Sequence, residues 1–168
     1  MGKIMGIDIG GSTTKIIGFD REKIFSPMLV KAADPISSVY GAFGKFLSVN
    51  KLSLDNIEKV MITGVGSTFI TDNLYNIPTE KVDEFQATGM GGLFLSKLER
   101  AIIVSMGTGT ALVTADSKGV KHMGGTGVGG GTLLGLSNRM LNVRSFDDLI
   151  ETAHGGNIGN IDLTIGDI

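Results

Sequence analysis

The sequence of 168 residues contains no cysteine, which excludes disulfides, thiolate zinc sites and iron–sulfur ligation by this chain. It also lacks a basic leader and any apolar run long enough to cross a bilayer, so we expect a protein of the reducing cytoplasm without a membrane anchor. Neither sign of charge dominates, with 15 basic and 17 acidic residues. A nucleic-acid surface is therefore not expected, and the partners predicted are small molecules or protein.

Glycine, in contrast, is abundant. The chain holds 26 glycines, about twice the usual share of roughly 7%, and they gather in a few segments. A hydrophobic content of 42% with 19% charged residues indicates a folded protein rather than a disordered one. The glycine clusters therefore mark loops in which close approach to the backbone has a purpose.

The first cluster joins two apolar segments, residues 4–9 and 15–19, which we predict as strands of a hairpin. Adjacent glycines leave backbone N–H groups uncovered, so the turn favours an anion. Asp8 is placed to hold a hydrated divalent cation beside bound phosphates, and Lys15 supplies the opposite charge. An ordinary glycine hairpin with a surface aspartate is the alternative. The residues predicted to bind phosphate here are Gly10, Gly11, Ser12, Thr13 and Lys15.

The segments that follow predict a mixed sheet with helices packed on it, a ribonuclease-H-like lobe of residues 1–100. We expect a strand over residues 23–30 and a helix from Pro35 to about residue 49, with Asp34 as its N-cap. A strand over residues 57–63 and a short helix over residues 67–74 come next.

A further helix is predicted to run from about residue 82 to residue 98, with three glycines in its first half, at 89, 91 and 92. Each interior glycine costs on the order of 1 kcal/mol relative to alanine, so these glycines suggest close approach by another backbone or a ligand. Two acids, Asp83 and Glu84, stand at the start of this helix. They either compensate the helix dipole or supply a catalytic base.

The hairpin pattern returns in the second part of the chain. Predicted strands over residues 101–106 and 111–115 are joined by a turn of glycine and threonine, a weak internal repeat of the opening. Two such hairpins would clamp the phosphates of one nucleotide from both sides. We therefore place a lobe boundary near Arg100, with a second lobe over residues 101–168.

The densest glycine cluster follows a predicted strand over residues 120–123. Six glycines occur in residues 124–131 and run into an amphipathic helix, which places a donor-rich loop on a helix N-terminus that attracts anions. A flexible linker is the alternative, although linkers do not nucleate such helices. A short helix capped by Ser145 and a possible strand over residues 161–165 complete the chain.

Four segments in this order, "GIDIGGSTTK", "DEFQATGMGG", "VSMGTGTALV" and "GGTGVGGGTLLGLS", resemble the type II pantothenate kinases of the acetate and sugar kinase, heat-shock protein and actin superfamily. The resemblance implies an α/β fold, with a ribonuclease-H-like (actin-like ATPase) first lobe and an incomplete second lobe. It also implies phosphorylation of pantothenate by ATP with Mg²⁺, the first step towards coenzyme A.

Residue by residue, the resemblance places Asp8 at the metal, Lys15 at the phosphates and Glu84 at the catalytic base. The nucleotide would meet Gly107, Thr108 and Gly109 of the second turn and Gly127, Gly129, Gly130 and Gly131 of the last cluster. One departure is His122, which stands where the family carries an arginine that assists at the transferred group or the substrate. An imidazole donates one hydrogen bond there, not a fork.

The other departure is length, since only 68 residues follow Arg100 (168 − 100). The resemblance therefore implies a fragment or half of a split enzyme, which would form a homodimer or need a partner chain with the missing segment. We expect an incomplete second sheet, with an edge strand near residues 120–123 or 161–165 that promotes self-association. The chain alone should bind phosphates weakly and show little or no turnover.

Three alternatives remain open. A sugar or amino-sugar kinase would share both phosphate turns, but it should carry an aspartate base after an apolar strand. An activator of acyl-CoA dehydratases has a similar opening, but it bridges an iron–sulfur cluster through cysteines. A non-catalytic half that binds nucleotide or a coenzyme A thioester would fit His122 and the short chain.

Overall fold

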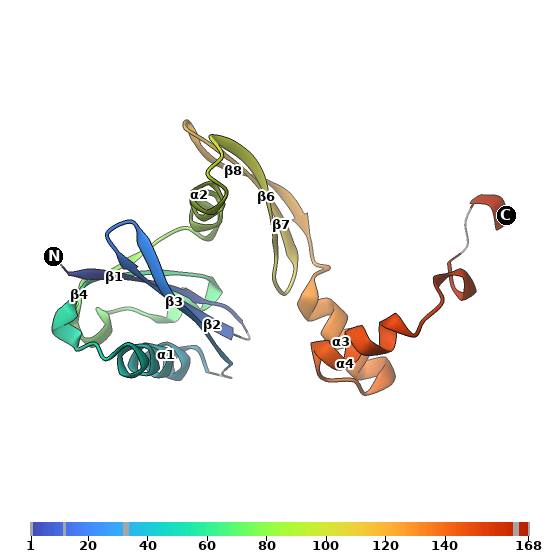
Figure 1. Cartoon of the computed structure of the whole chain (residues 1–168), viewed down its shortest axis with the longest axis horizontal. Helices are drawn as coiled ribbons and strands as arrows, with labels where there is room; N and C mark the ends of the chain where they lie inside the picture. Colours follow the sequence, from blue (N-terminus) through green and yellow to red (C-terminus); the bar gives the residue numbers. More distant parts are fainter. Residues whose placement is uncertain (1, 12, 32–33, 163–164, 168) are drawn as a thin grey trace. The chain divides into compact units, whose positions relative to one another are not determined.

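The chain forms two compact units in the computed structural model, which describes residues 2–11, 13–31, 34–162 and 165–167. The first unit comprises Met1–Ile103 with Val113–His122, and the second comprises Val104–Leu112 with Met123–Ile168. Figure 1 labels the helices and strands of both.

A five-stranded sheet in the order β3-β2-β1-β4-β5 organises the first unit. β1 (Lys3–Ile9), β2 (Thr13–Asp20) and β3 (Lys23–Lys31) form an antiparallel meander. β4 (Ile57–Thr63) pairs parallel with β1, and the short β5 (Thr79–Lys81) pairs parallel with β4. The sheet is therefore mixed, as the sequence predicts, and β1 lies at its centre.

Helix α1 (Pro35–Asn50) covers one face of this sheet (Figure 1). It begins at the predicted cap, because the Asp34 carboxylate accepts a hydrogen bond from the Ser37 backbone N–H at 2.6 Å. Alternate residues of the strands face the helix. The fully buried core that results comprises Met5, Ile7, Ile9, Ile16, Val39, Phe43, Phe46, Val60, Ile62 and Leu74.

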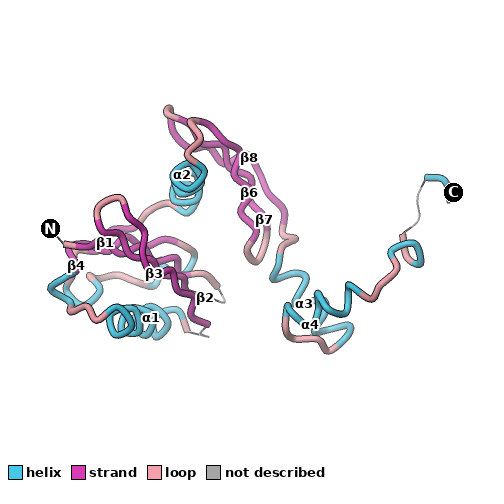
Figure 2. The backbone as a smooth tube through the Cα atoms, in the orientation of Figure 1, coloured by secondary structure: helices cyan, strands magenta, loops and turns pink. Residues whose placement is uncertain are grey.

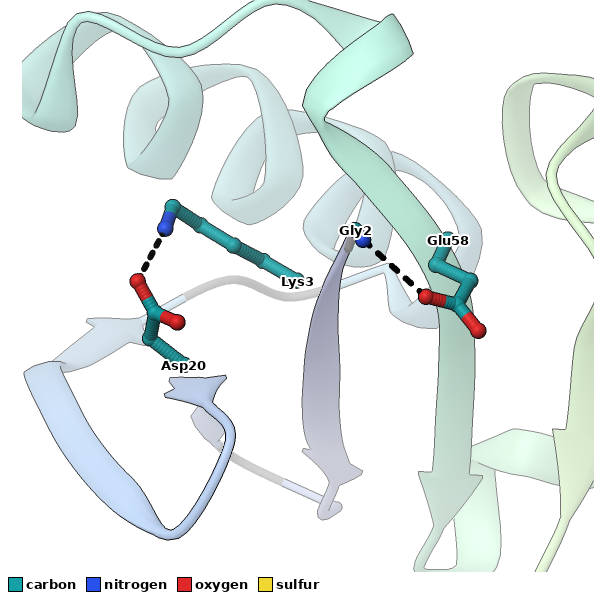
Figure 3. A network of polar contacts seen from close by, with 4 residues as sticks. All are labelled: Gly2, Lys3, Asp20 and Glu58. Atoms are coloured by element: carbon teal, nitrogen blue, oxygen red, sulfur yellow. Dashed lines mark hydrogen bonds and ion pairs between the residues drawn. The ribbon is translucent and has the colours of Figure 1, made fainter.

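Polar contacts fasten the start of β1 to its two neighbours (Figure 3). Lys3 Nζ donates to the Asp20 carboxylate at 2.5 Å across to β2, and the Gly2 N–H donates to the Glu58 carboxylate at 3.1 Å across to β4. The hydrogen bond from Lys3, followed by its charge, lowers the pKa of the Asp20 carboxyl. Both contacts are exposed, so they fix register more than they add stability.

Helix α2 (Glu84–Ser96) follows β5 and belongs to the first unit. After it comes a second sheet in the order β6-β7-β8, made of β6 (Arg100–Met106), β7 (Thr110–Asp116) and β8 (Gly119–Thr126). β8 extends the predicted strand by three residues into the glycine cluster. A Cβ at Gly125 would lie 2.4 Å from the Thr110 carbonyl oxygen, so the glycine permits the close pairing of β8 with β7.

The second unit continues with α3 (Gly130–Leu141) and α4 (Phe146–His154), which contact one another (Figure 2). Ser145 caps α4 as predicted, because its hydroxyl accepts a hydrogen bond from the Asp148 N–H at 3.3 Å. Two short 3₁₀ turns follow, Ile158–Asn160 and Ile165–Asp167.

Two sequence predictions of elements are wrong, and one strand, β5, is missed. The helix over residues 67–74 is instead a pair of 3₁₀ turns, Val65–Phe69 and Leu74–Asn76. Ile70, Leu74 and Ile77 are buried at helix-like spacing because the turns insert them one by one into the core. The described part of residues 161–165 is not a strand; Ile161 and Ile165 are 85% and 95% exposed, so no packing supports one.

Candidate nucleotide and catalytic site

The first glycine turn is closed by a hydrogen bond from the Gly10 N–H to the Thr13 carbonyl at 3.0 Å. Gly11 is exposed, with no atom within 4 Å of the place a Cβ would occupy. The backbone is therefore open to a ligand on this side, as the sequence predicts. Ser12, also predicted to contact phosphate, lies outside the described residues.

Asp8 and Lys15, which the sequence assigns to a metal and to phosphates, bind one another across the β1–β2 pair. Lys15 Nζ donates to Asp8 Oδ2 at 2.7 Å, with side-chain exposures of 55% and 33%. They occupy directly opposed positions in the antiparallel register. The two charges are thus held together at the mouth of the glycine turn, where each is accessible to solvent.

Sequence reasoning missed two residues on β4 that surround Asp8. Thr63 is the parallel partner of Asp8, and its Oγ1 is buried without a hydrogen-bond partner in the part of the chain described. Gly64 has φ 85°, and a Cβ there would lie 2.5 Å from Asp8 Oδ1. Only glycine adopts this backbone without strain and leaves the carboxylate accessible. The signal was the "TGVG" that follows the strand, but the parallel pairing that brings it to Asp8 is not visible in the sequence.

The face of the five-stranded sheet opposite α1 carries a cavity of about 540 Å³. Asp8, Lys15 and Thr63 form its polar part, and Ala87 of α2 is among its lining residues. The remaining walls are mostly apolar, from Ile17, Phe19, Leu29, Met61 and Val82. The Asp8–Lys15 pair therefore lies between the glycine turn and this cavity.

The two acids before α2 have different roles. Asp83 is the N-cap, and its carboxylate accepts a hydrogen bond from the Gln86 N–H at 2.9 Å. Glu84 is the first residue of the helix and is exposed, and the described residues offer its carboxylate no hydrogen bond or ion pair. The segment leading to it is anchored on the sheet, because the Val82 N–H donates to the Ile62 carbonyl at 2.8 Å. Asp83 therefore serves the helix, and Glu84 is chemically available.

The structure brings His122 to the start of the same helix. Its imidazole, on β8, stacks on the ring of Phe85 with centroids 3.9 Å apart and planes 8° from parallel. Phe85 follows Glu84 directly, so His122 and Glu84 belong to one local cluster of the first unit.

In the second unit the glycine turn and the start of α3 lie against one another. The Gly107 N–H donates to the Gly109 carbonyl at 2.8 Å, which forms the turn around Thr108, and the Gly131 N–H donates to the Gly107 carbonyl at 3.4 Å. A Cβ at Gly129 would lie 2.6 Å from the Gly109 carbonyl oxygen, and one at Gly131 would lie 2.9 Å from Thr108 Cα. These glycines are required for the contact. A Cβ at Gly130 would lie 3.4 Å from the Gly107 carbonyl oxygen, and one at Gly127 would meet no atom within 4 Å.

Three threonines hold this loop in shape and were not among the predicted site residues. Thr132 Oγ1 donates to the Gly127 carbonyl at 2.6 Å, and Thr110 Oγ1 donates to the Val128 carbonyl at 2.7 Å. Thr126 Oγ1 accepts from the Val128 N–H at 3.2 Å. Each of them directly follows a glycine, and this repeated "GT" pair was their signal. Together they fix the backbone before α3, whose first N–H groups and dipole favour an anion.

Among the described residues no group of three His, Cys, Asp or Glu side chains gathers as a metal site would require. A cation at Asp8 would therefore keep most of its water ligands, which is the usual behaviour of Mg²⁺. No helix in the described part of the chain is long and apolar enough to span a membrane.

Comparisons with known proteins give three results. The family model named Fumble matches residues 100–168. A type II pantothenate kinase of Bacillus cereus is 32% identical over 183 residues, which cover 100% of this chain and 60% of that protein. One of Staphylococcus aureus is 32% identical over 167 residues, covering 96% of this chain and 58% of that protein.

Among solved structures, the activator of the 2-hydroxyisocaproyl-CoA dehydratase from Clostridium difficile superposes with a TM-score of 0.71 at 18% identity. The superposition covers 92% of this chain and 57% of the activator chain. A ROK hexokinase from Thermus thermophilus superposes with a TM-score of 0.56 at 13% identity, covering 92% and 70%. These neighbours establish the fold as that of the actin-like ATPases, incomplete in this chain.

The resemblance predicted from the four motifs is confirmed, because the similarity to type II pantothenate kinases extends over the whole chain. The chain spans about 60% of the length of the curated relatives it matches.

Proposed function

We propose that this chain is part of a cytoplasmic pantothenate kinase, which transfers the γ-phosphoryl group of ATP to the hydroxyl of pantothenate and forms 4′-phosphopantothenate for coenzyme A synthesis. The observation that carries the proposal is the 32% identity to a type II pantothenate kinase over 100% of this chain. The geometry of the two glycine turns and the available carboxylate of Glu84 support it.

Glu84 is the proposed general base. As the hydroxyl oxygen of pantothenate bonds to the γ-phosphorus and the bond to the β-phosphate oxygen breaks, the hydroxyl proton passes to the Glu84 carboxylate. A positioned carboxylate typically contributes about 10²- to 10⁴-fold to such a step. The role is compatible with its place on the first turn of α2, since no described group competes for the carboxylate.

In the first unit, Lys15 and the backbone N–H groups of the first turn would bind phosphate. In the second unit, the N–H groups around Thr108 and at the start of α3 are also suited to bind phosphate. The oxygens of Asp8 and Thr63 fit Mg²⁺, because both are hard donors and Thr63 Oγ1 lies buried with no hydrogen-bond partner among the described residues. Bound Mg²⁺ would neutralise phosphate charge. Binding of nucleotide would exchange the Asp8–Lys15 pair for two productive contacts, with Lys15 on phosphate and Asp8 beside the cation.

His122 would donate a single hydrogen bond to the substrate or the transferred group. Because its ring is already stacked on Phe85, one edge of the imidazole remains for that contact.

The test is transfer of labelled phosphate from MgATP to pantothenate, with N-acetylglucosamine as the competing acceptor and Glu84→Gln as the inactive control. The assay is run on the chain alone and after addition of the C-terminal two fifths of a type II pantothenate kinase. Transfer to pantothenate that Glu84→Gln abolishes supports the proposal. Transfer to the sugar instead, or turnover equal in the variant, overturns it.

A second candidate is a nucleotide-binding, non-catalytic half, favoured by His122 at the position where the resemblance implies an arginine. β8 is an edge of the described three-stranded sheet, and we propose that such an edge promotes self-association or recruits a partner chain. Calorimetric binding of ATP without phosphoryl transfer, in a chain that light scattering shows to be oligomeric, would favour this function.

A further inference from the structure

Three contacts on one face of α2 hold this helix against the β6–β8 sheet. Phe85 stacks on His122, a Cβ at Gly89 would lie 2.6 Å from Val120, and one at Gly92 would lie 2.4 Å from Ile103. Positions 85, 89 and 92 lie on the same side of a helix, at spacings of four and three. The two glycines let the helix backbone approach the sheet, and the ring of Phe85 is the only large side chain of this stripe.

Glu84 precedes this stripe on the first turn of α2. Rotation of the first turn about the helix axis would carry the carboxylate away, and its own side chain has no described contact that would resist this. The Asp83 cap and the Val82 hydrogen bond restrain the backbone before the helix. Phe85 is the residue of the first turn that reaches across to another element and stacks there.

We propose that Phe85 is a positioning residue for Glu84: by stacking on His122 it fixes the rotation of the first turn of α2 and thereby the direction of the carboxylate. The proposal rests on the proposed function in one respect, that Glu84 is the base. The positioning itself is a property of the fold and is measurable without turnover.

The stack needs a flat side chain at each position. Phe85→Tyr keeps the ring, whereas Phe85→Leu keeps apolar volume and loses the plane. His122→Arg supplies a planar guanidinium that stacks on an aromatic face, and His122→Leu does not. The pairs of variants therefore separate the effect of planarity from that of burial.

The first experiment is magnetic resonance on the 168-residue chain. In the parent, the ring current of Phe85 shifts the His122 ring protons upfield, and Phe85→Leu returns them to ordinary positions. Because the chain has no cysteine, a spin label on Glu84→Cys reports on that position alone. We expect it to broaden the amides of residues 121–123 equally in the parent and Phe85→Tyr backgrounds, and less in Phe85→Leu.

The second experiment measures phosphoryl transfer after addition of the C-terminal two fifths of a type II pantothenate kinase, because the chain alone is expected to show little or no turnover. A misplacement of about 1 Å costs up to about 10²-fold, so we expect Phe85→Leu to lower kcat by ten- to a hundredfold with the KM for ATP unchanged and Phe85→Tyr near the parent. Phe43→Leu, on the buried face of α1, destabilises the same unit without touching α2 and controls for loss of stability.

The two experiments fail separately. Broadening unchanged in Phe85→Leu overturns the positioning, whatever the turnover. If Phe85→Leu loses the broadening but its kcat is no lower than that of Phe43→Leu, the positioning role is also overturned, since the direction of Glu84 would then not affect catalysis. If neither the parent nor any variant transfers phosphate, the proposed function fails. The spin-label experiment then still decides whether Phe85 fixes the first turn of α2.

Discussion

Alanine substitutions at Gly89 and Gly91 should differ in their effect on stability, although both replace a glycine of α2 and the two positions lie only two residues apart. A Cβ at Gly91 would meet no atom within 4 Å, whereas one at Gly89 would lie 2.6 and 2.7 Å from the two Cγ atoms of Val120. Contacts below 3.0 Å are essentially never observed for a real Cβ. The helix or the sheet must therefore move in Gly89→Ala, and neither needs to move in Gly91→Ala.

The magnitude follows from two opposing terms. Both substitutions gain about 1 kcal/mol, because alanine is the better helix former and restricts the unfolded chain. Overpacking of a closed contact costs about 1–3 kcal/mol and applies to Gly89 alone. Gly91→Ala should therefore be about 1 kcal/mol more stable than the parent, and Gly89→Ala should lie about 1–3 kcal/mol below Gly91→Ala.

Urea unfolding followed by far-ultraviolet circular dichroism measures the difference, and hydrogen exchange of the α2 amides localises it. Adding Val120→Ala should restore much of what Gly89→Ala loses, and a double-mutant cycle gives the coupling. Equal stability of the two glycine variants, or no coupling between positions 89 and 120, would refute the packing of α2 on β8 described above.

Lys15→Ala should weaken binding of ATP more than of adenosine in calorimetry, with Lys15→Arg as the charge-preserving control; equal losses would mean a structural role. Phe43→Ala should lower the free energy of unfolding of the first unit by about 3–5 kcal/mol, measured by urea unfolding, and a cost near zero would contradict its complete burial. Hydrogen bonds from Ser37 lower the pKa of the Asp34 carboxyl below its usual value. Their stabilisation of α1 is therefore present above the unfolded-state pKa and is lost as the pH falls through the folded-state pKa. Asp34→Ala should flatten this part of the acid unfolding profile, and an unchanged profile would exclude the cap as its source. Thr132→Val should weaken ATP binding by disordering the loop before α3, while Thr132→Ser retains it; equal affinities in calorimetry would show that the hydroxyl is dispensable.

Elements whose signals are local could be predicted from the sequence. β1 to β4 follow from alternating apolar residues, and the starts of α1 and α4 follow from their caps, Asp34 and Ser145. The pair of 3₁₀ turns could not be predicted, because Ile70, Leu74 and Ile77 are spaced as in a helix while tertiary packing alone decides their path. β5 is three residues long and exists only through its pairing with β4.

In the candidate site, too, the features with local sequence signals were predicted and those that depend on strand pairing were not. Both glycine turns were predicted, because glycine and hydroxyl residues at the end of an apolar strand have a local meaning; their binding of phosphate stays a prediction. Thr63 and Gly64 were missed because they reach Asp8 only through the parallel pairing of β1 with β4, strands separated by about fifty residues. The Asp8–Lys15 ion pair likewise depends on a register that places the two residues directly opposite one another.

The glycines of α2 left two interpretations open, close approach by a backbone or by a ligand, and the structure gives a third. Gly89 faces the side chain of Val120, and Gly92 faces that of Ile103. The two glycines lower the intrinsic stability of the helix, but they allow its backbone to pack closely on the sheet. Close packing of this kind would favour a catalytic base at the start of a helix, because catalysis depends on the orientation of the base more than on the stability of the helix that carries it. His122 extends this argument to the departure that the resemblance implies: an imidazole in place of an arginine would give up the fork of donors, and its ring provides a flat surface for Phe85. In the proposed mechanism, the imidazole would therefore change the hydrogen bonding at the site and keep the stack that we propose to position Glu84.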